Sequence, residues 1–243
     1  MTAPSQKNRY RSLDSFKTVE TIRVLNRRIA ERFPASGLCS VGAELCQVAV
    51  ENQERCEAIS RPNLGLRFGL GLVLVLGLAA LAYSVAAMKL SLGNINLGEF
   101  VQITEAAIND LVFIGIAVFF LVTVETRIKR NQALEALAEL RAIAHVIDMH
   151  QLTKDPSQFG RRVITTESSP KRDMSAFQLL RYFNYCSEML SLTGKVAAHH
   201  AQSFRDPGVL VAVNELENLT TGLSRKVWQK IMILNKLDRE AVE

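Results

Sequence analysis

The sequence predicts an all-α fold in which two transmembrane helices form a hairpin, the second continues as a long stalk helix, and the other helices form a cytoplasmic bundle. Three observations lead to this fold class. Two long stretches carry no charge, the rest of the chain shows an apolar period near 3.6 residues, and no segment alternates as a half-buried strand would. With 48% apolar and 22% charged residues, the composition excludes a disordered chain and a chain embedded in lipid throughout.

Three parts follow from this pattern. Residues 1–63 should form N-terminal cytoplasmic helices, residues 64–127 the transmembrane hairpin with a short external connection, and residues 128–243 the stalk and the C-terminal helical bundle. This division rests on where the charged residues stop and start again.

Residues 1–63 are expected to form two helices. The first has one apolar face and ends at Pro34, and the second has an apolar seam that includes the polar Asn52. The expected apolar positions are Phe16, Val19, Ile22, Leu25, Ile29 and Phe33 in the first helix, and Leu38, Val41, Leu45, Val48 and Ile59 in the second. Such an Asn sets the register of some coiled coils, but an ordinary helix pair is the simpler interpretation over this length.

The N-terminal region is basic. Residues 1–33 carry eight Lys and Arg against three Asp and Glu, and this surplus of five equals the net charge of the whole chain, +5. We therefore expect residues 7–32 to contact anionic lipid, each basic group contributing about 1 kcal/mol near the surface. Nucleic acid is the other polyanion to consider, but no interleaved aromatic platform or binding motif supports it.

The first span is predicted at Phe68 to Met88, 21 residues without a charge. A helix of this length is about 31 Å long, which matches the hydrocarbon core of a bilayer. The run starts too far into the chain and is too long for a signal peptide. The second span is predicted at Leu111 to Val124, and it reaches 19 residues if it starts at Ala106 and includes Asn109 and Asp110.

Basic residues flank the two spans on one side. Arg55, Arg61 and Arg67 precede the first span, Arg127, Lys129, Arg130 and Arg141 follow the second, and the connection between them contains only Lys89. The positive-inside rule then places both termini in the cytoplasm. A bacterial inner membrane is the expected location, and an organelle membrane is the alternative left open by an N-terminus rich in Arg and Ser.

Two interhelix ion pairs and one packing face are candidates within the hairpin. Arg67 and Glu125 fall at the same inner depth, and Lys89 and Asp110 at the same outer depth; alternatively, Arg67 extends to the inner headgroups. Gly65, Gly69 and Gly77 are the candidate packing glycines, since Gly65 and Gly69 have the small-xxx-small spacing that lets helices approach closely. Spare small residues favour association of several hairpins into a homo-oligomer.

A stalk helix is expected from about Ala106 to Leu152, because no Pro or Gly occurs between Glu125 and Leu152. Its predicted seam is Ala133, Leu137, Leu140, Ala144 and Ile147, which should pack against the N-terminal helices or a second copy. The same helix carries Arg141, His145 and Asp148 on one face. A hydrogen-bonded polar network is the expected role of this cluster, because metal binding on one helix prefers His at i and i+4.

Two more helices complete the expected bundle. One runs from about Ser175 to Phe204, and the other follows the capping pair Asp206–Pro207 and extends to about Leu237. Their expected apolar contacts are Phe177, Leu180, Phe183, Leu190 and Val196 in the first, and Val227, Trp228, Ile231 and Leu234 in the second.

No motif identifies a chemical activity. The four cysteines form no CxxC pair, and the sequence has no Gly-rich phosphate loop, nucleophile elbow or HExxH. We therefore expect no metal, no cofactor and no catalytic residue that the sequence alone can name.

The sequence favours a membrane scaffold or docking protein that oligomerises and presents its helical domain to a cytoplasmic protein partner. A homo-oligomeric cation channel, with acidic rings at Asp110 and Glu125, is the alternative. An enzyme with a site assembled inside the bundle is the third possibility. Against the channel, the face that would carry a polar stripe holds Leu111, Ile114 and Val118 instead.

Overall fold

The computed structural model describes residues 12–90, 97–156, 167 and 174–240. All regular elements in this part of the chain are α-helices, six in number, as the sequence predicts. The chain divides into two compact units, one built from residues 1–60 and 132–243, which we call the bundle, and one from residues 61–131, the two-helix unit. Described residues from the N-terminal and C-terminal parts of the chain thus contribute to one core.

Helices α1 (Ser15–Arg32) and α2 (Gly37–Ser60) open the bundle. Asp14 caps α1 by accepting a hydrogen bond from the Lys17 amide at 3.2 Å, and the Ser36 hydroxyl accepts one from the Cys39 amide at the start of α2. In the turn between them, Ala35 has a φ of 55°. A left-handed backbone is unfavourable for a residue with a Cβ, so this tight turn is strained.

Helix α4 (Leu97–Leu152) is unbroken over 56 residues, which confirms the predicted continuous helix and extends its start to Leu97. Its section from Ala133 onward belongs to the bundle, and the five residues of the predicted seam are all buried. This section contacts three other helices through the Arg55–Glu139 and Arg141–Glu215 salt bridges and through a hydrogen bond from the Tyr182 hydroxyl to the His150 carbonyl.

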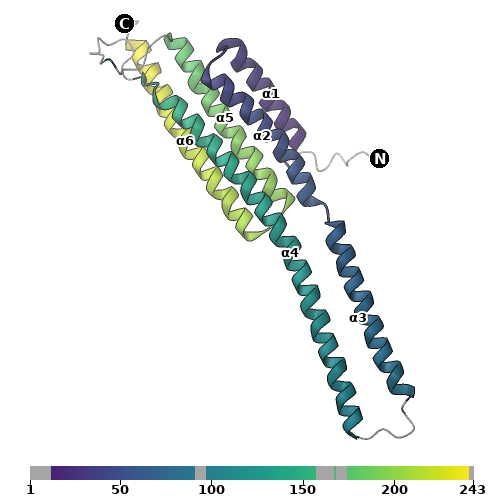
Figure 1. The fold of residues 1–243 in the computed structure, drawn as a ribbon. Coiled ribbons are helices and arrows are strands. Elements are labelled where there is room, and N and C mark those ends of the chain that lie inside the picture. The colour runs from purple at the N-terminus through teal and green to yellow at the C-terminus, as the bar shows by residue number, and fades with distance from the viewer. Residues whose placement is uncertain (1–11, 91–96, 157–166, 168–173, 241–243) are drawn as a thin grey trace. The chain divides into compact units, whose positions relative to one another are not determined.

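Helices α5 (Ala176–Ser203) and α6 (Pro207–Glu240) complete the bundle (Figure 1). Ser175 and Gln178 form a capping box at the start of α5, and the Asp206 carboxylate accepts bonds from the Gly208 and Val209 amides at the start of α6. The predicted Asp206 cap is therefore confirmed. Each cap of this type contributes about 1 kcal/mol.

Helix α5 lies at the centre of the bundle. It packs against α1, α2 and α6, and half of its 28 residues are buried. Phe33 of the α1–α2 turn stacks edge-on against Tyr182 and Tyr185, so α5 also holds the end of α1. An amphipathic surface helix buries one apolar stripe. A helix that packs against three others needs small or apolar side chains on most of its surface.

Three aromatic side chains that were expected to be buried are exposed. Phe16 is 64% exposed, Phe177 58% and Trp228 60%. Their spacing predicts an apolar face, but spacing alone does not say whether a neighbouring helix covers that edge. The other predicted apolar positions of α1 and α2 are all buried.

The two-helix unit contains α3 (Leu64–Leu90) and the first part of α4. The two helices run antiparallel within it, since the Asn63 amide donates to Glu125 and a Cβ on Gly77 would collide with the Ile114 side chain. Two helical stretches of the described residues, one within Gly37–Ala80 and one within Ala107–Leu152, are apolar and long enough to cross a membrane, and neither apolar stretch is buried.

Candidate functional site

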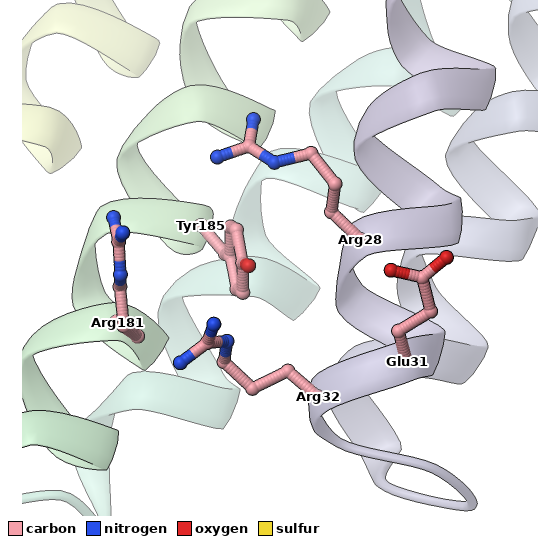
Figure 2. A pocket seen from close by; sticks show the side chains of 5 residues that line it. All are labelled: Arg28, Glu31, Arg32, Arg181 and Tyr185. Atoms are coloured by element: carbon pink, nitrogen blue, oxygen red, sulfur yellow. The ribbon is translucent and has the colours of Figure 1, made fainter.

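The surface of the bundle has a pocket between α1 and α5. Its lining residues are Arg28, Glu31, Arg32, Arg181 and Tyr185, and it encloses about 350 Å³. We call it the arginine pocket (Figure 2). Arg28 and Arg32 are one turn apart on α1, and so are Arg181 and Tyr185 on α5, so each helix directs two side chains into the same space.

Aromatic rings hold the three guanidinium groups. The Arg28 guanidinium lies 5.4 Å from the centre of the Tyr185 ring, and those of Arg32 and Arg181 lie 5.4 Å and 5.8 Å from the centre of the Phe177 ring. The exposed Phe177 ring is thus a contact for two cations. Cation–π contacts orient a charge without neutralising it.

A layer of neutral polar groups lies inside the bundle. His199 Nε2 is 3.0 Å from the Thr18 hydroxyl, and His200 Nε2 is 2.6 Å from the side-chain oxygen Oδ1 of Asn52. The Asn52 amide donates to the Val48 carbonyl, so its side-chain oxygen is free to accept from His200. His200 Nδ1 is buried with no hydrogen-bond partner among the described residues.

Both histidines are held neutral by their surroundings. Burial lowers the pKa of His200 to about 4, with further lowering from His199 and Arg55. Burial also lowers the pKa of His199, and Asp14 partly opposes this. Two neutral imidazoles paired with a hydroxyl and an amide are structural groups that join α5 to α1 and α2.

The buried cysteines are thiols, not thiolates. Burial raises the pKa of Cys186 to about 12, and burial raises that of Cys56 against a weaker effect of Ser203. Thiolate is the reactive form, so neither residue is an activated nucleophile. The described residues contain no group of three or more His, Cys, Asp or Glu side chains that could hold a metal ion.

The predicted polar cluster on α4 is distributed over different partners. Arg141 forms a 2.8 Å salt bridge with Glu215 of α6, and the Asp148 carboxylate accepts a 2.6 Å hydrogen bond from Gln151. His145 is exposed. Among the described residues, no hydrogen bond joins Arg141, His145 and Asp148 to one another. Arg141 is bonded instead to Glu215 and Asp148 to Gln151.

Glu125 in the two-helix unit has partners other than the predicted one. Its carboxylate accepts from the Asn63 amide at 3.1 Å and lies 3.0 Å from Lys129 Nζ, and Lys129 also donates to the Arg61 carbonyl. Arg67 is exposed, and the salt bridges of the described residues do not include a pair between Arg67 and Glu125. The proposed partner of Asp110, Lys89, has a side chain outside the described residues.

The three candidate glycines have different surroundings. Gly77 lies against Ile114, so it marks the close approach of α3 and α4. A Cβ on Gly69 would meet nothing within 4 Å, and one on Gly65 would meet only the Asn63 side chain at 3.6 Å. Gly65 and Gly69 therefore do not serve the packing of α3 on α4.

Sequence reasoning did not find the arginine pocket. The pairs Arg28/Arg32 and Arg181/Tyr185 are visible as neighbours one turn apart, but only the packing of α1 on α5 brings the pairs together. No family model, curated protein or solved structure matches this chain.

Proposed function

We propose that this chain is an integral membrane protein in which α3 and the first part of α4 anchor a helical bundle that acts as a docking platform. The observation that carries the proposal is apolar surface that the chain itself leaves uncovered. Phe68, Phe113 and Phe119 are each at least 70% exposed, and neither apolar stretch is buried. In water, apolar surface costs about 25 cal/mol per Å², whereas lipid covers it without this cost.

Basic residues support an orientation with the bundle in the cytoplasm. Arg61 and Arg67 stand at one end of α3, and Arg127, Lys129 and Arg130 stand where α4 leaves the predicted span. The antiparallel contacts bring these two ends to the same side of the unit. By the positive-inside rule this side, both termini and the bundle are cytoplasmic, and a bacterial inner membrane is the host.

The partner is proposed to dock on α6. Trp228 is 60% exposed and Met232, one turn later, is 53% exposed on the same helix. Neighbouring large apolar side chains that remain uncovered on a folded bundle favour an interaction site, and Trp is enriched in binding hot spots. A second copy of the chain is proposed to associate through the uncovered Gly65–Gly69 face of α3.

A docking platform fits the two-helix unit better than a cation pore does. An acidic ring attracts cations only if its carboxylates face the pore without a fixed counter-charge, and Glu125 is paired with Lys129 on the same helix. The half-buried Asp110 is then the single acidic group that remains for such a ring in the predicted second span.

The anchor is tested by topology. Alkaline phosphatase fused after residue 95 should be active in intact bacteria, and the same enzyme fused after residue 243 should be inactive, while a fluorescent protein gives the opposite pattern. The full chain should stay in the membrane pellet after carbonate extraction. If both fusions report the same compartment, the hairpin and the roles assigned to it are wrong.

The docking surface is tested by photo-crosslinking in cells. A photoreactive amino acid at Trp228 should give one discrete adduct with another protein, and the same group at the neighbouring exposed Gln229 should give much less. Equal adducts from both positions would contradict docking on this face. The pore is tested by ion flux in liposomes. If the chain conducts ions and the flux disappears with Asp110→Asn and Glu125→Gln, the pore is the correct function and the docking platform is wrong.

A further inference from the structure

The arginine pocket has the size of a ligand site and a mostly cationic lining. Its volume of about 350 Å³ lies within the range of small-molecule pockets, which begins near 300 Å³. In Figure 2 the side chains of Arg28 and Arg32 extend from α1, and those of Arg181 and Tyr185 from α5, into one shared space. Cationic groups from two helices repel one another, so placing these arginines together is electrostatically unfavourable for folding.

The charges in the pocket are only partly neutralised within the chain. Arg28 lies 3.1 Å from Glu188, and both side chains remain close to half exposed. Among the described residues, neither Arg32 nor Arg181 has a carboxylate within salt-bridge distance, although Glu31 lines the same pocket. Three arginines against Glu31 leave a surplus of two positive charges, and counting Glu188 leaves one.

The arginines are pre-oriented. Arg32 and Arg181 share the Phe177 ring, and Arg28 lies over Tyr185, itself only 3% exposed. A guanidinium held against a ring loses less side-chain entropy when it binds a ligand, and its hydrogen-bond donors along the edge stay available. The pocket is therefore ready for an anion before the anion arrives.

We propose that the arginine pocket binds a phosphate group. A carboxylate has two oxygens and is satisfied by one bidentate arginine, whereas a phosphate offers three or four oxygens to donors from several directions. Three guanidiniums from two helices are such a set. The charge of a phosphate monoester, about −1.5 to −2 near neutral pH, is opposite in sign to the surplus in the pocket, which is one positive charge when Glu188 is counted. A phospholipid headgroup and a free phosphorylated molecule share this chemistry.

The first test is a titration of the purified full-length chain in maltoside detergent, by native mass spectrometry, with inorganic phosphate and separately with short-chain phosphatidic acid. The double variant Arg32→Gln/Arg181→Gln should weaken binding by roughly 100-fold, about tenfold for each arginine. The control Arg27→Gln/Arg225→Gln removes the same charge from exposed positions outside the pocket and should keep the affinity within about twofold.

The two probes distinguish the source of the phosphate. Pocket-dependent binding of inorganic phosphate supports a free ligand, and pocket-dependent binding of phosphatidic acid alone supports a lipid headgroup. The proposal is overturned if neither probe binds, if both double variants weaken binding equally, or if a polyglutamate peptide binds at least about tenfold more tightly than both probes.

A second measurement does not depend on the variants folding. Phenylglyoxal modifies free guanidinium groups, and the modified peptides can be identified by mass spectrometry. The bound probe should slow the modification of Arg32 and Arg181 in the wild-type chain and leave the rate at Arg27 unchanged. Equal protection at all three positions would contradict a site at the pocket.

Discussion

Acidification should destabilise the bundle through His200. This side chain is fully buried, and its surroundings lower its pKa to about 4, while a histidine in an unfolded chain has a pKa near 6.5. The structure explains why the pKa of His200 is lowered. Nε2 already donates to Asn52, so a second proton would go to Nδ1, which is buried with no acceptor among the described residues.

The sign and size follow from proton linkage. Between pH 6.5 and 4 the unfolded chain binds a proton at His200 that the folded chain does not, so the free energy of unfolding decreases as the pH decreases. The effect is nearly absent at about pH 7.5. At about pH 5 the unfolded imidazole is mostly protonated and the folded one is not, which costs about 2 kcal/mol.

The assay is urea unfolding of the full-length chain in detergent, followed by fluorescence of Trp228, the single tryptophan. His200→Gln keeps a donor for Asn52 and cannot titrate, so its stability should fall by about 2 kcal/mol less than that of wild type between the two pH values. His145→Gln is the matched control, because it makes the same substitution at an exposed histidine outside the His200–Asn52 contact. Identical pH dependence in wild type and His200→Gln would refute the reasoning.

Three further predictions concern packing, a turn and a surface pair. Gly77→Val should lower the thermal unfolding temperature in detergent, because the new side chain collides with Ile114 and overpacking costs about 1–3 kcal/mol; Ile114→Ala should restore part of the loss, and failure to do so would disprove this contact. Ala35→Gly should stabilise the bundle in urea by up to about 1 kcal/mol because it relieves the positive φ, and a loss of stability would contradict strain there. Breaking the exposed Arg141–Glu215 bridge with Glu215→Gln should cost less than about 1 kcal/mol, and a larger cost in the same assay would show that the pair is coupled to the core.

Some features of this protein depend on local sequence alone. The apolar period fixed the buried positions of α2 and the buried seam of α4, and Asp206–Pro207 marked the start of α6. The absence of Pro and Gly predicted that α4 continues past the apolar stretch without a break. These predictions succeed because helix formation and capping depend on backbone geometry and on neighbours within about one turn.

Tertiary structure decided which of these faces and groups have partners. Trp228 and Phe177 have the spacing of buried residues, yet both are exposed, and the Phe177 ring contacts two arginines. Spacing does not say whether a neighbouring helix covers an edge. The contacts of His200 with Asn52 and of His199 with Thr18 join residues 148 and 181 positions apart.

The arginine pocket belongs to the same category. The sequence by itself determined that α1 is a basic helix and that Arg181 and Tyr185 lie one turn apart on α5. Only the packing of α1 on α5 brings these groups within reach of one anion. The physical reason is that sequence periodicity shows which residues share a face of one helix. A site built from two helices depends in addition on how the two helices pack against each other.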